Sequence, residues 1–448
     1  MKQIGLIIDI PGGSPDHEKI LAKLKQDFSA LGGKVVFFGN QPGGSVKPLS
    51  ALDSFSGTII SLVGEKQEPV TDNGSFLRAA VDIRTLHRGY TLQRGIGINI
   101  LRQLEALANL EENLRLTLLT DRLESLPEIL QALNLPVQDY QDFNPEDFDL
   151  LHLTDPMNFA EELPLLPENA GDIKVVSNFY DLIPLIFPSG YFIDDEAGRQ
   201  AYRNRLEEIR GRVDFFLTIS DCTANEMQSR LEIPAESIKT MACGVEGKFF
   251  RPAKANVRQK YNLGKQYILY SGSHDYRKRL DILINAFAQV HRSTGGDIQL
   301  ALTGAYDPRF ESLMNDFIQD PKVREDVRLL GYVPEDDLVS LYNEAELFLF
   351  PSIYEGFGLP VVEAMAAGCP VVAVKASAVP EVAGEAAILV PPGDTKGMAE
   401  AALQIIRNPI LKNELREKGK SRAREFTWEK SARKTLEGYR QALKIESP

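Results

Sequence analysis

Short apolar runs alternate with amphipathic segments along almost the whole chain. This alternation is typical of doubly wound α/β domains, in which each helix returns the chain to the same edge of a parallel sheet. The runs expected to form strands are residues 4–10, 35–39, 57–64, 77–84, 115–121, 149–155, 173–181, 214–220, 266–273, 298–304, 327–333, 345–350 and 371–374. The segments expected to form helices are residues 17–33, 98–110, 196–212, 281–291, 336–345 and one capped by Ser220 or Asp221.

The length of the chain indicates more than one domain. Because 448 residues are too many for a single hydrophobic core, we expect two or three domains. A turn with aromatic residues and a proline at residues 244–252 precedes a new strand, so we place one boundary there. The two α/β halves that result would each have the size of a nucleotide-binding domain.

Charge and cysteine usage exclude several classes of protein. The net charge of −13 argues against a nucleic acid partner, because neutralising phosphates requires a basic surface. Cys222, Cys243 and Cys369 lie far apart without a metal-like spacing, so we expect a reduced cytoplasmic setting. No stretch reaches the roughly 18 apolar residues of a spanning helix. The apolar run before Asp9 is too short for the hydrophobic part of a signal sequence, so we expect none. A peripheral position at the inner membrane face is the alternative.

Residues 351–370, PSIYEGFGLPVVEAMAAGCP, predict a polar corner between a buried strand and a helix. Gly356 and Gly358 allow the backbone to turn and to approach a ligand closely. Pro360 suits the first helical position, where its missing N–H costs nothing. The helix start would direct backbone amides toward an anion or sugar oxygens. These are the amides of Phe357, Gly358 and Leu359.

Two glutamates flank this corner. Glu355 follows the strand, and we expect Glu363, eight residues later, in the first turn of the helix. The helix dipole would favour an acid at that place without any ligand. An ordinary strand–helix crossover with two solvated glutamates is therefore the alternative for this spacing taken alone.

These segments together resemble the retaining nucleotide-sugar glycosyltransferases of the GT-B fold, specifically the large family four (glycosyl transferases group 1). Glu355 and Glu363 resemble the E-x7-E signature of that family, and residues 376–394 resemble the segment that follows it. Residues 267–287 are similar to the strand–loop–helix that carries a diphosphate-binding Arg-Lys pair. The resemblance is strong over roughly residues 215–445 and weaker over 77–200.

The resemblance implies two Rossmann-like domains that face a cleft, preceded by an extra N-terminal α/β segment. The expected divisions are an extension of unknown role at 1–75, an acceptor-side domain at 76–250, a donor-binding domain at 251–425 and a helix crossing back at 426–448. The resemblance does not extend to residues 1–75, which would be an interaction module or an added flank of the first sheet.

A basic pair is expected to hold the donor diphosphate. Breaking the anomeric bond requires positive charge beside the departing phosphates, and the resemblance assigns this role to Arg277 and Lys278. Gly272 ends the preceding strand, and His274 lies in the loop, placed for a phosphate or acceptor contact. A solvated basic turn is the alternative. Arg279 stands where the family usually has Asn, which would change a contact at the helix start.

The resemblance also assigns the contacts to the nucleoside and the sugar. Glu363 would accept hydrogen bonds from the ribose hydroxyls, and Glu355 would contact the transferred sugar, whose hydroxyls the corner amides would hold. Gly95 and Gly97 resemble the first-domain glycine loop that approaches the diphosphate, although a plain helix start reads the same. Ile98 and Asn99 replace the usual Arg-Tyr.

One departure concerns the catalytic centre. Residues 178–188 resemble a segment usually written His-Asp-x-x-Pro, with Asp181 and Pro184 in place. Tyr180 stands where the family commonly has the histidine that contacts the donor sugar. Tyr stays uncharged near neutral pH, so the electrostatic help of an imidazolium would be lost. Tyr180 and Asp181 are nevertheless candidate catalytic residues, together with Glu355, Arg277 and Lys278.

The activity implied is transfer of a sugar from a UDP- or GDP-sugar to a saccharide or lipid-linked acceptor with retention, as in polysaccharide biosynthesis. No Asp-x-Asp motif or ligand cluster suggests a metal, and no cofactor is expected. The rivals are a non-catalytic GT-B subunit of a glycan-assembly complex, a dinucleotide-dependent oxidoreductase, and a sugar phosphorylase or epimerase. Against the oxidoreductase, the chain has no full G-x-G-x-x-G motif followed by an acidic residue about 20 positions later. His152 is expected either in the cleft or in the core, and Trp428 as packing for the final helix.

Overall fold

The computed structural model describes residues 5–8, 59–62, 76–87, 95–110, 112–158, 163–252, 256–304, 317–318 and 320–445. The chain divides into two compact units, Met1–Ser75 and Phe76–Pro448. In the first unit, β1 (Gly5–Ile8) and β2 (Ile59–Leu62) pair in parallel, at the places where strands are expected. The strand expected at 35–39 and the helix expected at 17–33 lie outside the described residues.

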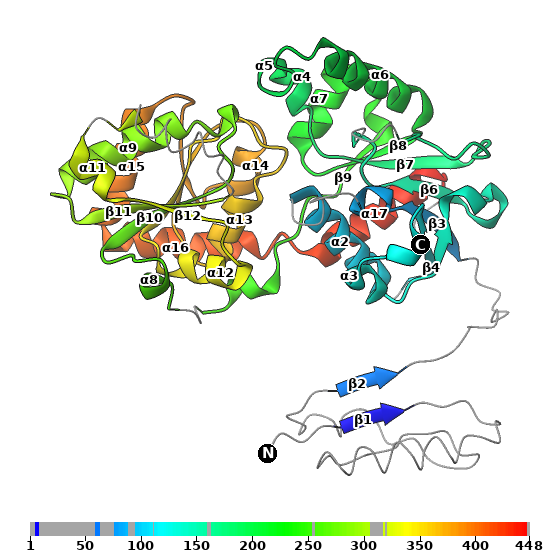
Figure 1. Cartoon of the computed structure of the whole chain (residues 1–448), viewed down its shortest axis with the longest axis horizontal. Helices are drawn as coiled ribbons and strands as arrows, with labels where there is room; N and C mark the ends of the chain where they lie inside the picture. The colour runs from blue at the N-terminus through cyan, green and yellow to red at the C-terminus, as the bar shows by residue number, and fades with distance from the viewer. Residues whose placement is uncertain are drawn as a thin grey trace. The chain divides into compact units, whose positions relative to one another are not determined.

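Two parallel sheets form the cores of two lobes in the second unit (Figure 1). The first sheet has the order β5-β4-β3-β6-β7-β8-β9, and every neighbouring pair is parallel. Its strands are β3 (Leu77–Asp82), β4 (Leu114–Thr120), β5 (Val137–Asp139), β6 (Leu150–Leu153), β7 (Lys174–Phe179), β8 (Phe215–Thr218) and β9 (Ile238–Thr240). We call the elements on this sheet the first lobe.

The second lobe is built on the order β12-β11-β10-β13-β14-β15, again parallel throughout. Its strands are β10 (Gln266–Ser271), β11 (Ile298–Thr303), β12 (Val327–Gly331), β13 (Leu347–Phe350), β14 (Val371–Val374) and β15 (Ile388–Val390). The four inner strands β10, β11, β13 and β14 are buried on both faces, as parallel sheets covered by helices require.

Helices connect the strands of both lobes, as the alternation of the sequence predicts. The first lobe contains η2 (Arg84–His87), α2 (Gly95–Ala108), η4 (Leu123–Ser125), α3 (Glu128–Gln131), η5 (Tyr140–Asp142), η6 (Pro145–Asp147), α4 (Ile183–Ile186), α5 (Pro188–Tyr191), α6 (Glu196–Arg212), α7 (Asp221–Leu231) and η7 (Ala235–Ser237). After β9, the helical elements of the chain are η8 (Gly247–Phe250), α8 (Val257–Lys260), η9 (Tyr276–Lys278), α9 (Leu280–Ser293), α11 (Pro321–Glu325), α12 (Glu335–Glu344), α13 (Leu359–Ala366), α14 (Val379–Ala383), α15 (Thr395–Arg407), α16 (Pro409–Ala423) and α17 (Trp428–Ala442). Ser220 caps α7 by accepting from the Thr223 amide, which confirms the expected cap.

The strand orders show where ligands can bind. In both sheets the chain starts in the middle, moves to one edge, and then returns to build the other side. The reversals fall between β3 and β6 in the first sheet and between β10 and β13 in the second. In open α/β sheets, ligands bind beyond the carboxyl ends of the strands at such a switch point.

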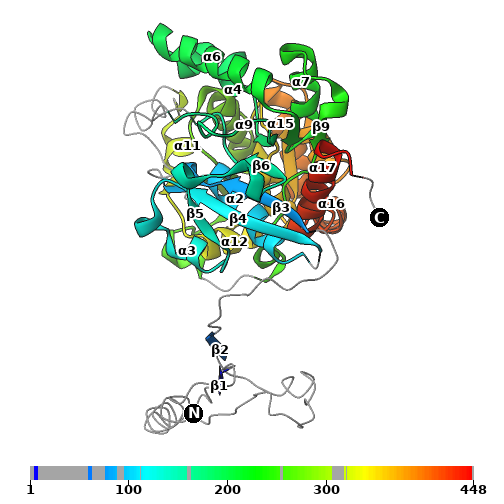
Figure 2. The ribbon, with the colours of Figure 1, turned by 90° about the vertical axis from the view of Figure 1, so that its right-hand side faces the viewer.

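The last helix belongs to the first lobe although it follows the second in sequence. Helix α17 packs on α2 and on strands β7, β8 and β9 (Figure 1, Figure 2). Gly438 permits this contact, because a Cβ there would lie 2.5 Å from Leu217 Cδ2. At the start of α17, Trp428 packs on Gly244, which confirms its expected packing role.

A buried polar network fixes α17 to the first sheet. The Tyr439 hydroxyl and His152 Nδ1 share a hydrogen bond of 2.7 Å, and His152 Nε2 lies 3.0 Å from Asn178 Oδ1. Gln103 donates to the Thr435 hydroxyl at 3.0 Å. Burial lowers the pKa of His152 to about 4, so its ring is neutral near neutral pH. Of the two places expected for His152, the structure confirms the core.

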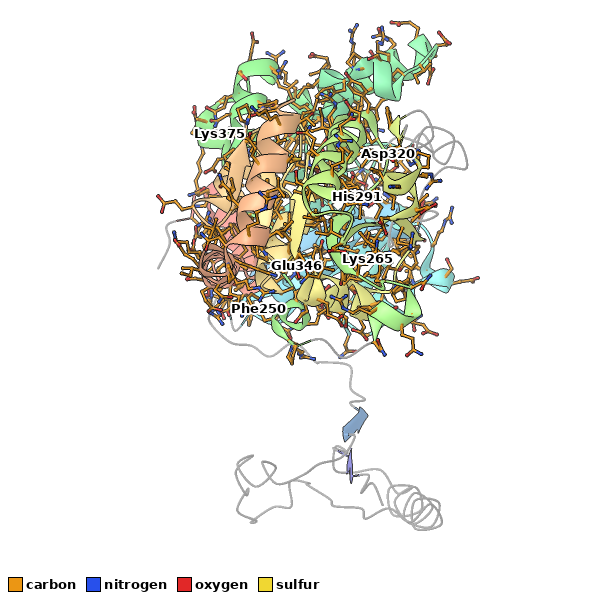
Figure 3. All side chains as sticks on the ribbon, turned by 90° about the vertical axis from the view of Figure 1, so that its left-hand side faces the viewer. Phe250, Lys265, His291, Asp320, Glu346 and Lys375 are labelled. Carbon is orange, nitrogen blue, oxygen red and sulfur yellow. The ribbon has the colours of Figure 1, made fainter. Side chains whose placement is uncertain are left out.

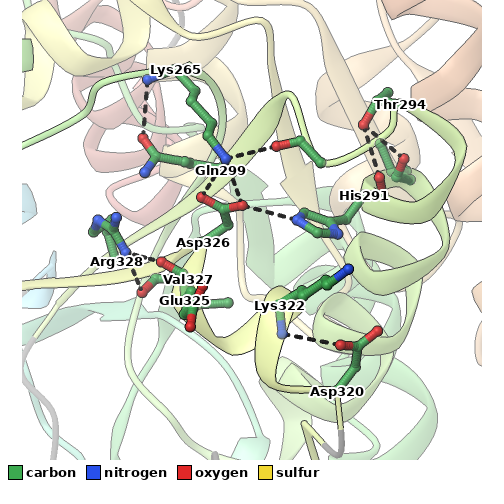
Figure 4. Close-up of polar contacts among 12 residues, drawn as sticks. Lys265, His291, Thr294, Gln299, Asp320, Lys322, Glu325, Asp326, Val327 and Arg328 are labelled. Atoms are coloured by element: carbon green, nitrogen blue, oxygen red, sulfur yellow. Dashed lines mark hydrogen bonds and ion pairs between the residues drawn. The ribbon is translucent and has the colours of Figure 1, made fainter.

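An ion cluster lies at the amino ends of the second-lobe strands, on the edge opposite the switch point. Lys265 (Figure 3) precedes β10 and Asp326 precedes β12. The Lys265 amine contacts both Asp326 carboxylate oxygens at 2.8 and 3.0 Å (Figure 4). His291 Nε2 lies 3.0 Å from Asp326 Oδ2. These groups satisfy one another, so the cluster serves to fix α9 and the strand starts.

Among the described residues, no helix combines the length and hydrophobicity needed to cross a membrane.

Candidate functional site

The predicted corner forms at the carboxyl end of β13. The chain leaves β13 at Phe350, turns through residues 351–358 and enters α13 at Leu359. Gly358 is the N-cap with φ of 105°, a left-handed conformation that favours glycine. Helix α13 has no side-chain cap, so its first amides depend on other partners. Pro360 is the second helical residue rather than the first, which its missing N–H tolerates equally.

The basic pair and Glu355 come together from the two strands that flank the switch point. Lys278 Nζ donates to Glu355 Oε1 at 2.6 Å, and Arg277 Nη1 lies 3.0 Å from Glu355 Oε2. Arg277 also donates to the Tyr354 carbonyl at 2.7 Å. Both cations follow β10 in η9, whereas Glu355 follows β13. The side chains of all three are largely buried, so the arrangement is a built cluster and not a solvated basic turn.

The electrostatics of this cluster favour the charged form of Glu355. Burial alone would raise the pKa of Glu355, but the charges of Lys278 and Arg277 outweigh burial and hold that pKa below its usual value. Burial lowers the pKa of Lys278 in spite of the neighbouring carboxylate. Arg277 and Lys278 both face Glu355, and Asp275 lies 3.6 Å from Arg277 Nε. A guanidinium and an ammonium group placed side by side suit a diphosphate.

Glu363 lies apart from this cluster, in different surroundings. It is the fifth residue of α13 and so belongs to the second turn, not to the first turn where we expected it. The helix dipole acts mainly within the first turn, so it does not explain an acid here. Tyr342 donates to Glu363 Oε2 at 3.4 Å. Burial, together with the charge of Glu335, raises the pKa of Glu363 to about 7.

Asp181 and the backbone of Tyr180 lie against the corner from the first lobe. A Cβ added to Gly356 would lie 2.6 Å from the Tyr180 carbonyl oxygen and 3.2 Å from Asp181 Cβ. The Asp181 carboxylate accepts from the Ile183 amide at 2.9 Å. Burial raises the pKa of Asp181 to about 6, although the Ile183 amide and the charge of Arg277 act against this rise. The close approach explains why glycine stands at residue 356.

Comparison with known proteins decides the family. Residues 253–424 match the family model described as glycosyl transferases group 1. The chain is 31% identical over 272 residues to O-antigen chain mannosyltransferase B of Escherichia coli, covering 60% of this chain and 70% of that protein. The chain belongs to the group 1 glycosyltransferases.

This group 1 glycosyltransferase is also similar to a longer relative and to solved structures of the same fold. Serotype-specific mannosyltransferase WbdA of Escherichia coli is 26% identical over 62% of this chain, but the chain spans only 35% of that protein. Sucrose-phosphate synthase from Thermosynechococcus elongatus has a TM-score of 0.60 at 20% identity, over 82% of this chain and 98% of that chain. Anabaena HepE in complex with UDP and glucose has a TM-score of 0.61 at 15% identity, over 81% and 98%. The expected GT-B fold is thereby confirmed.

The hydroxyl of Tyr180 points into the buried network of the first lobe. It donates to the Thr154 carbonyl at 2.9 Å and accepts from Asn178 Nδ2 at 3.2 Å. The side chain is 7% exposed, and burial holds its pKa well above the usual value. In this group 1 glycosyltransferase, the residue in place of the family's histidine therefore joins the core network next to His152.

The glycines expected to approach the donor lie in different settings. Gly95 and Gly97 are the first and third residues of α2, so of the two settings expected, a glycine loop or a helix start, the structure shows the helix start. Arg94 lies outside the described residues. Gly272 follows β10, and its carbonyl approaches Gly304 so closely that a Cβ on Gly304 would lie 2.1 Å from it. His274 is half-buried in the loop between β10 and η9.

Phe357 shows a second function of the corner. Its side chain is 4% exposed and packs edge-on against Phe426, with ring centroids 5.5 Å apart. Phe426 lies in the segment that leads into α17, and its carbonyl accepts from the Val245 amide at 3.1 Å. The corner therefore contacts the crossover between the lobes directly. Sequence reasoning considered the amide of Phe357 but not its ring.

Several residues that support the site were not anticipated from the sequence. The Ser377 hydroxyl accepts from the Glu355 amide at 2.7 Å. Asp275 accepts from the Arg277 amide at 3.1 Å and from the Tyr191 hydroxyl of the first lobe at 2.8 Å. Glu381 accepts from the first amides of α7, at 3.0 and 3.1 Å. Ser377 and Glu381 belong to the segment 376–394 that resembled the family, which was the available signal.

The described residues contain no group of three or more His, Cys, Asp or Glu side chains that could hold a metal ion. The charged groups that face one another at the switch point are the cations Arg277 and Lys278 and the carboxylates of Glu355 and Asp275. Arg277 and Lys278 supply positive charge at this place.

Proposed function

We propose that this group 1 glycosyltransferase transfers a sugar from a UDP- or GDP-sugar to a saccharide or lipid-linked acceptor, with retention of anomeric configuration and without a metal. The observation that carries the proposal is the convergence of Arg277 and Lys278 on Glu355 at the switch point of the second sheet. Within the division 76–250, 251–425 and 426–448, the second domain would bind the donor.

The leaving diphosphate would be held by the basic pair. As the bond between the anomeric carbon and the phosphate oxygen breaks, negative charge grows on the diphosphate, and fixed cations stabilise it without reorganisation. Arg277 provides a planar fork and Lys278 a compact charge. The amides of Phe357, Gly358 and Leu359 at the start of α13 would complete the donor site. Gly272 and His274, in the loop between β10 and the basic pair, would contribute further contacts.

The acceptor hydroxyl would attack on the face that the diphosphate leaves, and its proton would pass to the departing phosphate oxygen. The new bond then has the configuration of the broken one. Glu355 would hold the transferred sugar, and Glu363 would accept hydrogen bonds from the ribose diol. Asp181 adjoins Gly356 and would meet the sugar from the first lobe, while Gly95 and Gly97 would face the diphosphate.

The relatives support a more specific donor. Both Escherichia coli proteins described above are mannosyltransferases, one of them of O-antigen chains. We therefore favour mannose as the transferred sugar and a growing polysaccharide as the acceptor, in association with a glycan-assembly partner or a membrane surface.

A thermal-shift titration with UDP, GDP, ADP and their sugars tests the donor site. One nucleotide class should raise the melting temperature of the wild type. The shift should vanish in Glu363→Ala and persist in Glu400→Ala, an exposed helical glutamate of the same lobe. If no nucleotide shifts the wild type, the proposed function is wrong. Product analysis by NMR, with EDTA present, then tests retention and independence of metals.

A non-catalytic GT-B subunit is the second candidate, and Tyr180 is the observation that favours it. Its hydroxyl is bound to the Thr154 carbonyl and is not available to a sugar in this conformation. A protein that binds a nucleotide sugar but neither transfers nor hydrolyses it would fit this candidate. Slow hydrolysis of the donor by the wild type, absent in Lys278→Ala, would exclude it.

A further inference from the structure

The first lobe has a small polar cavity at its own switch point. It encloses about 20 Å³ beyond the carboxyl ends of β3 and β6, the two strands between which the order of the first sheet reverses. This is the place where open α/β sheets bind ligands. Its polar lining comes from Asp82, Arg84, Thr85, Asp155, Asn158 and Arg205.

The two arginines of the lining are already bound. Arg84 donates to both oxygens of Asp82, at 2.7 and 3.0 Å, and to the Pro164 carbonyl at 3.0 Å. Arg205 pairs with Glu208 at 3.0 Å and donates to the Leu163 carbonyl. These groups therefore form the walls of the cavity and carry little unpaired positive charge.

Thr85 and Asp155 are the groups that can receive a ligand. Thr85 is 6% exposed, and its hydroxyl has no hydrogen-bond partner among the residues that the structure describes. Leaving such a group unpaired is unfavourable, so the position favours a bound polar group. Asp155 is 8% exposed, and its carboxyl group interacts with the Asn158 side chain. Burial raises the pKa of Asp155 to about 7.

The size and charge of the cavity define the kind of ligand. A volume of about 20 Å³ exceeds the roughly 10–15 Å³ that one water needs, so one small polar group fits and a whole sugar ring does not. The negative charges of Asp181 and Asp82 act on Asp155, and this repels an anion. A neutral hydroxyl, which both donates and accepts, matches a threonine hydroxyl beside a carboxyl group.

The cavity is adjacent to the candidate active site. Asp155 follows β6 and Asp181 follows the neighbouring strand β7, and the two carboxyl groups interact electrostatically. Asp181 in turn adjoins Gly356 of the corner. A hexose that reached into the cavity with one group would therefore place its ring near the corner.

We propose that this cavity binds one hydroxyl or hydroxymethyl group of the acceptor saccharide and that Thr85 and Asp155 select it. The inference rests on the proposed glycosyl transfer and adds the residues that choose the acceptor. Arg84 acts through Asp82 as a positioning residue that keeps the cavity open.

Saturation-transfer NMR on the full chain tests the proposal. The probes are methyl α-hexosides of manno, gluco and galacto configuration at millimolar concentration with a nucleoside diphosphate present, followed by the monodeoxy analogues of the hexoside that binds. Removing one particular hydroxyl should weaken binding to the wild type roughly tenfold, the effect of one hydrogen bond to a charged or buried group. The same deletion should have no effect on Asp155→Asn or Thr85→Val, because these variants have already lost the contact.

Two controls separate recognition from folding. Thr85→Ser keeps the hydroxyl and should bind as the wild type does, and Asp172→Asn changes an exposed carboxylate outside the cavity. The nucleotide thermal shift of every variant should equal that of the wild type. The inference is overturned if no hexoside binds, or if Asp155→Asn and Thr85→Val still discriminate the deoxy analogue, which would indicate a cavity for water only. Failure of the nucleotide shift in the wild type would instead overturn the proposed function.

Discussion

The amine of Lys278 donates a 2.6 Å hydrogen bond to Glu355, a residue 77 positions away in the sequence. Arg277 binds the other oxygen of the same carboxylate at 3.0 Å. Glu355 thus neutralises part of the positive charge that, in the proposed function, binds the diphosphate. A donor that enters would compete with Glu355 for the two cations, and the carboxylate would become available to the sugar hydroxyls.

Replacing Glu355 by Gln should destabilise the protein. The change removes the carboxylate that Arg277 and Lys278 share and leaves Lys278 buried without its ion-pair partner, which costs about 3–5 kcal/mol in the free energy of unfolding. Urea denaturation measures the loss, and Glu400→Gln, at an exposed position, should stay within about 0.5 kcal/mol of wild type. A nucleoside diphosphate should restore part of the stability. Equal stability of both variants would refute the structural role of the cluster.

Replacing Lys278 by Ala should reduce turnover of the donor by about 10²–10³-fold, the usual effect of losing one preorganised group that stabilises developing charge. Release of the nucleoside diphosphate measures this rate. Arg279→Asn is the matched control, because Arg279 pairs with Asp281 at 2.7 Å and does not contact Glu355. Turnover of that control should stay near wild type. A comparable loss in both variants would show that the positive charge acts only at long range.

Replacing Gly356 by Ala should push the corner away from the first lobe. The new Cβ would lie 2.6 Å from the Tyr180 carbonyl oxygen, so backbone must move, at a cost of about 1–3 kcal/mol. Gly211→Ala, in α6 with no atom within 4 Å, should instead stabilise by about 0.5–1 kcal/mol. Thermal unfolding distinguishes the two signs. A neutral Gly356→Ala would mean that the lobes are not held at this contact.

Nucleotide affinity should depend on pH through Glu363. Burial and the charge of Glu335 raise the pKa of Glu363 to about 7, and the ribose diol binds best to the carboxylate. Binding must then release a proton below this pH, so affinity should rise as pH increases and level off above about 7. Isothermal titration measures the profile. Glu335→Gln should move the inflection to lower pH, and Glu363→Gln should remove it; an unchanged profile in both would contradict the assignment.

The sequence predicted the corner well because its signals are local. The strand before Glu355, the turn at Gly358 and the cap at Ser220 each depend on a few adjacent residues, and the structure contains all three. Helix boundaries were less certain, since Gly95 and Gly97 read equally as a loop or a first turn. For the same reason Glu363, which was expected in the first turn of the helix, lies in the second turn of α13.

Other features depend on residues distant in sequence. The Tyr180 hydroxyl belongs to a hydrogen-bond network that includes Tyr439, which lies more than 250 residues later in the sequence. No local sequence pattern predicts that these residues belong to one network. Arg279 is a further case, because its left-handed φ of 48° appears only in the structure. Asn tolerates that conformation better than Arg, which gives a physical reason for the Asn common in the family.

The attachment of α17 to the first sheet affects how the protein is made. During synthesis, residues 76–240 leave the ribosome long before α17, so Gln103 and His152 still lack Thr435 and Tyr439, their partners on that helix. The first lobe can reach its native core only when translation of the helix is finished. Until then it is an incomplete folding intermediate that exposes apolar surface to chaperones and proteases.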